Sequence, residues 1–229
     1  QIRTTISLNN VPVKIAGAHA GLSVGPDGAT HQALEDMALM RVQPNMTVLY
    51  PADSEEARKA TLAAAAHPGP VYIRLAREKT PVMTTLDTPF EIGKSNVVWE
   101  SGQAPWAVVF ATGPLLYQAL MAAKELEFKI PVTVVNVSSI KPLDTETILS
   151  LAKDAGALVT VEEHQLAGGM GSAIAELLAA ELPLPIEFVA VKNRFGQSGT
   201  AEELYQEYGL SQMHIVEAIT KAAARRAVK

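Results

Sequence analysis

Short apolar runs alternate with longer amphipathic segments along almost the whole chain. The apolar runs are rich in β-branched residues and predict buried strands at 11–16, 46–50, 71–75, 106–111, 132–137, 158–162 and 186–191. The segments between them predict helices at 31–41, 54–67, 115–128, 145–154 and 171–181, with two more after Thr200 and Ser211. Continuous apolar strands separated by helices are typical of parallel sheets covered on both faces. The pattern therefore predicts an α/β fold built from two parallel-type αβα layers.

Capping residues mark where several of these helices are expected to begin. Asp53 and Thr200 are each followed three residues later by a glutamate, the capping-box pattern, and Thr30, Asp144 and Ser211 also occupy cap positions. A capping side chain accepts hydrogen bonds from backbone N–H groups that the first helical turn leaves free. These residues therefore predict helix starts at five places.

A segment rich in proline and threonine, 80–89, interrupts the alternating pattern. Such a composition is typical of a linker. We expect a first domain at 1–83, a linker at 84–95 and a second domain at 96–229. The first domain has fewer strands than a doubly wound domain usually contains, and Gln1 is not an initiator methionine, so we expect that further residues precede it.

Composition and charge narrow the class of protein. The 229 residues are 48% hydrophobic and 19% charged, which fits a globular protein with a filled core. The net charge is −5 and the basic residues are scattered, so we expect no nucleic-acid partner; no apolar run reaches the roughly 18 residues of a membrane span. The absence of cysteine excludes disulfides and thiolate chemistry and is compatible with the cytoplasm, where we expect the protein.

Glycine and polar residues are densest between residues 17 and 31, after a predicted strand and before a predicted helix. Ligands of open α/β sheets bind at this carboxyl end of the strands. His19, Asp27 and His31 lie close together in this segment and could serve acid–base work or hydrogen-bond a polyol. The alternative is an ordinary Gly-Pro-Asp-Gly turn with surface histidines.

Two arginines follow the predicted strand at 71–75. Arg74 and Arg77 are well placed for a phosphate, because guanidinium offers paired donors in a fixed fork. The alternative is that both form surface ion pairs. His31 and Glu35 stand one helical turn apart, but no third ligand has a recognisable spacing, so no metal site is predicted.

A second glycine cluster, Gly168-Gly-Met-Gly171, follows Glu162 and the strand at 158–162. Glycines before a helix N-terminus can form an anion site. Tight packing between strand and helix is the alternative, and we favour it because this motif alone is a weak signal.

Several motifs in collinear order closely resemble those of transketolases. They are Gly17 to Gln32 with its Asp-Gly-Ala-Thr-His-Gln, Leu34-Glu-Asp36 and Arg41, Pro44-Asn-Met, Tyr50-Pro-Ala-Asp53, Tyr72-Ile-Arg-Leu-Ala-Arg77, Ile140-Lys-Pro-Leu-Asp144, Val159-Thr-Val-Glu-Glu-His164 with Gly168-Gly-Met-Gly, and Arg194. The likeness spans essentially the whole chain. It implies the end of a pyrimidine-binding domain followed by a transketolase C-terminal domain.

The resemblance also implies an activity and residue roles. Transketolases move a two-carbon ketol unit between sugar phosphates with thiamine diphosphate and Mg²⁺. By resemblance, His19 contacts the sugar phosphate, Asp27 meets the C2 hydroxyl, and His31 lies beside the thiazolium of the cofactor and the first substrate hydroxyls. Arg77 is the better match for the residue that binds the substrate phosphate, with Arg74 nearby.

The resemblance places the main cofactor-binding groups outside this chain. In the family, the activating glutamate lies upstream of the position of Gln1, and a separate N-terminal domain holds the diphosphate and Mg²⁺. We therefore expect the chain alone to be inactive. It is either a fragment or one subunit of a split enzyme, whose partners are the N-terminal part, the sugar phosphates, and further copies in a homodimer or heterotetramer.

Three other readings remain open. 1-Deoxy-xylulose-5-phosphate synthase shares the Asp-Gly-x-Thr-His-Gln signature, but an Asp-Arg pair tends to stand there where this chain has Ala18-His-Ala20, and the helix after the signature differs from Ala33 to Ala38. The β subunits of 2-oxo acid dehydrogenases match less well. The chain could also be a non-catalytic assembly module, since the C-terminal domain of this family mainly supports the dimer.

Overall fold

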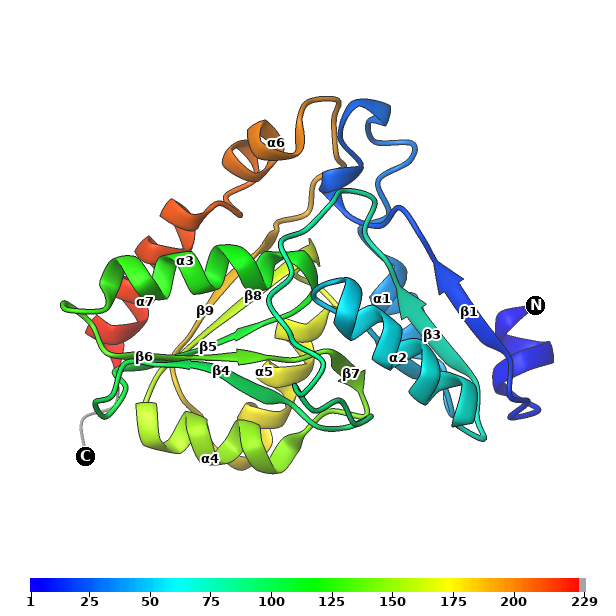
Figure 1. Ribbon diagram of the computed structural model, residues 1–229, viewed down its shortest axis with the longest axis horizontal. Helices are drawn as coiled ribbons and strands as arrows, with labels where there is room; N and C mark the ends of the chain where they lie inside the picture. Colours follow the sequence, from blue (N-terminus) through cyan, green and yellow to red (C-terminus); the bar gives the residue numbers. More distant parts are fainter. Residues whose placement is uncertain (227–229) are drawn as a thin grey trace.

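The computed structural model describes residues 1–226 and contains two β-sheets that lie side by side, with helices around them (Figure 1). The strands are β1 Lys14–Gly17, β2 Thr47–Leu49, β3 Val71–Arg74, β4 Asn96–Glu100, β5 Ala107–Ala111, β6 Val132–Asn136, β7 Ser139–Lys141, β8 Leu158–Gln165 and β9 Ile186–Val191. The α-helices are α1 Asp36–Arg41, α2 Ser54–Ala66, α3 Leu116–Leu126, α4 Thr145–Ala155, α5 Met170–Glu181, α6 Ala201–Glu207 and α7 Gln212–Arg225. Shorter helical turns are η1 Ile2–Ser7, η2 Leu22–Asp27 and η3 Gly113–Leu115. The α/β class predicted from the sequence is confirmed.

Both sheets are mainly parallel, and each has one antiparallel edge strand that the pattern did not predict. The first sheet has the order β1-β3-β2-β7 and the second β4-β6-β5-β8-β9. β7 pairs antiparallel with β2, and β4 pairs antiparallel with β6. β7 comes from the second half of the chain but completes the first sheet, so the two sheets do not separate cleanly at the linker.

Apolar packing joins the two sheets. Val48 and Tyr50 of the first sheet share one buried cluster with Phe110 of β5 and with Ile148 and Ile174 of the helices α4 and α5. On the opposite face of the second sheet, α3 and α7 cover a separate cluster (Figure 1). The burial of these side chains fixes the first sheet against the second, which positions the loops at their carboxyl ends.

The segment at 75–95 forms no helix or strand and packs against the rest of the chain. Phe90 and Ile92 lie against the small cluster formed by α2 and the first sheet. Among residues 1–226, no helix has the length and apolar character that crossing a membrane requires.

Three of the five predicted helix caps are confirmed, whereas Ser211 precedes α7 without a capping hydrogen bond from its side chain. Asp53 accepts a 2.9 Å hydrogen bond from the backbone N–H of Glu56, Asp144 caps α4, and Thr200 forms a complete capping box. The prediction for Thr30 was wrong. Its hydroxyl pairs with the side chain of His31, and the helix expected at 31–41 begins only at Asp36, because residues 28–35 form turns.

Candidate functional site

The loop at residues 17–32, which we call the glycine-rich loop, leaves the carboxyl end of β1 and folds over the edge of the first sheet. Two backbone hydrogen bonds close its base, from Ala20 to the carbonyl of Leu75 at 3.1 Å and from Gly21 to the carbonyl of Ala33 at 2.9 Å. His19, Asp27 and His31 are all exposed on this loop. The structure therefore exposes the three predicted side chains to solvent on one loop.

Arg77 joins this group through Asp27. Its guanidinium donates 2.9 Å to the Asp27 carboxylate and 2.7 Å to the carbonyl of Val24. The side chains of the ion pair are 36% and 38% exposed. Because water reaches both partners, the pair is weak, and a ligand can replace either partner at little cost. A guanidinium in this setting suits a phosphate or carboxylate of a ligand.

The two histidines differ in their local restraint. His19 has a backbone φ of 59°, in the left-handed region that non-glycine residues seldom adopt. Such a conformation persists only where its surroundings hold it and is enriched at functional sites. The imidazole of His31 pairs through Nδ1 with the hydroxyl of Thr30 at 2.9 Å, which leaves Nε2 for another partner.

Gln32 is a structural residue of the loop to which sequence reasoning gave no role. Its buried amide nitrogen donates to the carbonyl oxygens of Leu22, Gly25 and Gln197, at 3.1, 3.3 and 3.0 Å. These bonds tie both arms of the loop to a segment of the second half of the chain. The signal in the sequence was its place at the end of the Asp-Gly-Ala-Thr-His-Gln motif.

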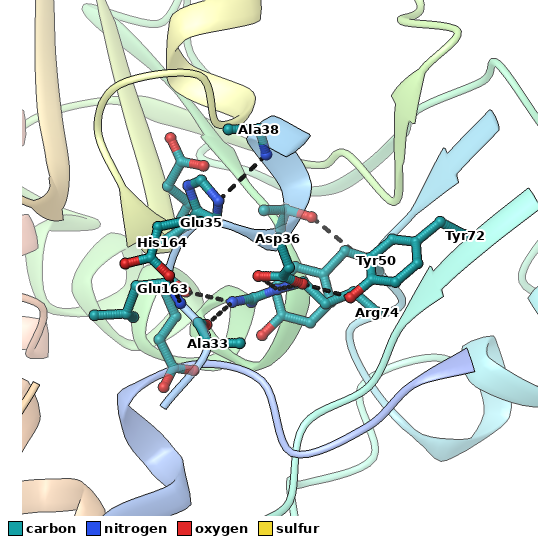
Figure 2. A network of polar contacts seen from close by, with 12 residues as sticks. Ala33, Glu35, Asp36, Ala38, Tyr50, Tyr72, Arg74, Glu163 and His164 are labelled. Carbon is teal, nitrogen blue, oxygen red and sulfur yellow. Dashed lines mark hydrogen bonds and ion pairs between the residues drawn. The ribbon is translucent and has the colours of Figure 1, made fainter. Parts of the chain in front are cut away.

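The prediction that Arg74 would serve a ligand is contradicted by its burial. Arg74 is fully buried, forms a 2.9 Å ion pair with Asp36, and donates to the backbone carbonyls of Ala33 and Glu163. Its guanidinium also lies 4.4 Å from the centre of the Tyr50 ring. Figure 2 shows Ala33, Asp36, Tyr50 and Glu163 gathered around Arg74. The arginine is the last residue of β3, and its bond to the carbonyl of Glu163 on β8 places its side chain between the sheets, away from solvent.

The polar residues around Arg74 form one network, which we call the buried joint. Its members are Asp36, Tyr50, Tyr72, Arg74, Glu163 and His164 (Figure 2). Burial acts to raise the pKa of Asp36, but the charge and hydrogen bonds of Arg74, with a bond from Tyr72, outweigh it and hold that pKa below its usual value. The pair is therefore ionised and structural.

The second glycine cluster packs tightly between strand and helix. The N-terminus of α5 binds a carboxylate of the protein itself. The carboxylate of Glu162 accepts hydrogen bonds from the backbone N–H groups of Met170 and Gly171, at 2.7 and 2.8 Å. Burial raises the pKa of Glu162 to about 7, although these two bonds oppose the shift. The amides of the first turn of α5 are therefore already engaged.

No metal centre is found in the described part of the chain. Residues 1–226 contain no group of three or more His, Cys, Asp or Glu side chains that could hold an ion. His31 and Glu35 do not share a helix, because α1 begins at Asp36.

Comparisons with known proteins agree with these observations. Residues 1–83 match the model of the transketolase pyrimidine-binding domain, and residues 98–215 match the model of the transketolase C-terminal domain. A 6-deoxy-6-sulfo-D-fructose transketolase subunit from a Clostridium species is 36% identical over 227 residues, which cover 99% of this chain and 70% of that protein. A 1-deoxy-D-xylulose-5-phosphate synthase from Leptothrix cholodnii is 40% identical over 228 residues, covering 96% of this chain and 35% of that enzyme.

A solved structure described as a split-gene transketolase, an inactive β4 tetramer, matches with a TM-score of 0.91 and 42% identity, covering 99% of this chain and 72% of that one. The chain spans between about a third and 70% of the length of the curated relatives it matches. Both family models and both sheets point to one assignment, and the chain belongs to the transketolase family.

Proposed function

We propose that this chain is the substrate-side part of a thiamine-diphosphate-dependent transketolase that transfers a two-carbon ketol unit between sugar phosphates. The observation that carries the proposal is the exposed group of His19, Asp27 and His31 on one loop, joined by Arg77 through its ion pair with Asp27. A sugar phosphate carries hydroxyls along its chain and an anion at one end. The group offers hydrogen-bonding side chains for the first and a guanidinium for the second.

Each residue has a part in this proposal. Arg77 binds the substrate phosphate together with His19, and Asp27 accepts a hydrogen bond from the C2 hydroxyl once the phosphate has taken its place on Arg77. His31 donates or accepts through its free Nε2 at the reacting end of the sugar, where a histidine can also move a proton. The pair of Arg77 and Asp27 at 2.9 Å gives this exchange a physical basis, because both partners are already within reach of solvent.

Thiamine diphosphate would supply the carbanion chemistry. The described residues offer no group of three or more His, Cys, Asp or Glu side chains for its Mg²⁺. We propose that an N-terminal polypeptide or segment holds the diphosphate and the metal and assembles with this chain into a homodimer or heterotetramer. The relatives described as a transketolase subunit and as a split-gene transketolase support this arrangement.

A second candidate is 1-deoxy-xylulose-5-phosphate synthase, because one such enzyme is 40% identical to this chain. The two reactions differ in their donor, a ketose phosphate in one and pyruvate in the other. The Ala18-His-Ala20 sequence, where the synthase tends to have an Asp-Arg pair, favours transketolase. A donor comparison therefore separates the two candidates.

The test is an assay of this chain combined with its N-terminal part, thiamine diphosphate and Mg²⁺. We expect ketol transfer from xylulose 5-phosphate to ribose 5-phosphate, and a loss of roughly 10²-fold in kcat/KM for His31→Ala. His214→Ala on α7, outside the glycine-rich loop, is the control and should keep its activity. Consumption of pyruvate in place of the ketose would favour the synthase, and full activity of His31→Ala would favour a non-catalytic module.

A further inference from the structure

Two consecutive carboxylates on β8 point in opposite directions. Glu162 and Glu163 are both fully buried, and successive side chains of a strand face opposite sides of the sheet. Glu162 accepts hydrogen bonds from the start of α5. Glu163 faces the other side and reaches the glycine-rich loop, which belongs to the first half of the chain. Glu162 and Glu163 are thus two buried glutamates of one strand with different hydrogen-bond partners.

Glu163 holds the loop at Ser23. Its carboxylate accepts hydrogen bonds from the backbone N–H of Ser23 and, at 3.2 Å, from the Ser23 hydroxyl. The hydroxyl of Tyr205 on α6 donates to the same carboxylate at 3.2 Å. The fit is close enough that a side chain at Gly21, whose φ is +89°, would overlap the carboxylate. Only glycine at this position lets the loop approach the acid and adopt the turn.

The contact between Glu163 and Ser23 also restrains the exposed part of the loop. Ser23 is followed by Val24, whose carbonyl accepts the 2.7 Å bond from Arg77. The segment η2 is kinked at Gly25 and ends at Asp27, which forms the ion pair with Arg77. Only three residues thus lie between Ser23, which contacts Glu163, and Asp27, the proposed ligand-binding carboxylate. A loop anchored at its base holds its tip within a narrow range of positions.

We infer that Glu163 is a positioning residue that fixes the glycine-rich loop, and through it Asp27 and Arg77, for the substrate; this rests on the proposed function. The second sheet then contributes to the site without touching the ligand. Gln32 makes a parallel connection through the carbonyl of Gln197. The role differs from passive support of an assembly, because it predicts a specific kinetic effect.

The first readout is the activity of the assembled enzyme. We expect Glu163→Gln to lower kcat/KM about 10- to 100-fold, because a displaced loop misplaces the groups that bind the substrate, with KM for the phosphorylated acceptor rising more than kcat falls. Glu162→Gln changes an equally buried acid of the same strand and should stay within about 3-fold per folded molecule. Equal losses in the two variants would mean that Glu163 has only a structural role and would overturn the inference.

The second readout needs no catalysis. Hydrogen exchange of the Ser23 amide should accelerate about 10-fold or more in Glu163→Gln and stay unchanged in Glu162→Gln. The amides of Met170 and Gly171 should show the reverse. An unchanged Ser23 amide in Glu163→Gln would overturn the inference whatever the activity. If hydrogen exchange follows the expected pattern but the assembled enzyme shows no ketol transfer, the proposed function is overturned. The positioning role of Glu163 then remains.

Milder variants keep the inference testable if Glu163→Gln does not fold. Ser23→Ala and Tyr205→Phe each remove one hydroxyl that donates to Glu163 and leave its charge in place. Each should raise KM about 3-fold or more, and combining the two changes should cost less than the sum of the single effects, because both hydroxyls act on the same carboxylate. Additive effects would mean that these hydroxyls act independently of Glu163 and would contradict the inference.

Discussion

Two arginine–aspartate pairs, in the glycine-rich loop and in the buried joint beneath it, have the same length and opposite surroundings. Arg77 and Asp27 lie 2.9 Å apart with side chains 36% and 38% exposed, whereas Arg74 and Asp36 lie 2.9 Å apart with side chains 0% and 13% exposed. The arginines are three residues apart in the sequence. The distance between the charges therefore says little about the role of a pair. The exposure of the pair to water decides that role.

Burial makes the inner pair a fixed part of the fold. Arg74 also binds the carbonyls of Ala33 and Glu163, so two separate segments, residues 33–36 and β8, depend on one guanidinium. Water cannot replace any of these partners. The outer pair lies where water already competes with it, so a ligand can replace Asp27 at Arg77. The difference indicates that one arginine stabilises the structure and the other is free to bind.

The largest expected effect is on the inner pair. Arg74→Met leaves Asp36 as a buried charge without its partner, and we expect the free energy of unfolding to fall by about 3–5 kcal/mol. Urea unfolding measures this loss in the free energy of unfolding. Arg77→Met, three residues away, is the matched control and should cost about 1 kcal/mol or less. Similar losses in both variants would break the comparison between the pairs.

A second prediction uses pH to test the buried side of the comparison. His164 lies in the buried joint, where its Nδ1 pairs with the carbonyl of Gln165 at 2.7 Å and its Nε2 accepts a bond from the N–H of Ala38 at 3.4 Å. The neutral ring satisfies both contacts. Burial, with the charge of Arg74, lowers the pKa of His164 from 6.5 to about 4. Because this pKa is lowered on folding, its contribution to stability is present above pH 6.5 and is lost as the pH falls through 4.

His164→Gln removes the titration and keeps one donor and one acceptor. We expect wild type to lose about 3 kcal/mol more than this variant in the free energy of unfolding between pH 6.5 and pH 4. Glu162→Gln should change the pH dependence with the opposite sign. The pKa of Glu162 is raised from 4.5 to about 7, so its contribution is present below pH 4.5 and is lost as the pH rises through 7. Parallel pH profiles for wild type and both variants would contradict the assigned burial.

Local pattern predicted much of this fold and part of its site. Strand periodicity located β5, β6, β8 and β9, and Asp53, Asp144 and Thr200 marked helix starts, because each depends only on residues nearby in sequence. The glycine-rich loop was found because its polar and glycine residues are concentrated in one segment. These signals need no knowledge of how the two sheets meet.

The features that were missed depend on packing between distant segments. Arg74 and Arg77 both follow an apolar run, and only the second sheet, laid against the end of β3, makes one a buried residue. Glu163 reaches a loop 140 residues earlier in the chain. β7 is too short for its pairing with β2 to appear in the pattern. Each of these outcomes is set by tertiary contacts, which override local preference.

The smallest expected effect on stability completes the comparison. Asp27→Asn removes the charge of the outer pair and leaves the bond from Arg77 to the carbonyl of Val24 in place. We expect the free energy of unfolding to change by less than about 1 kcal/mol, and by less still in 1 M salt, where the screening length is about 3 Å. Urea unfolding at low and high salt measures this difference. A loss above about 2 kcal/mol, insensitive to salt, would mean that the outer pair is as structural as the inner one and that Arg77 is not free to exchange Asp27 for a ligand.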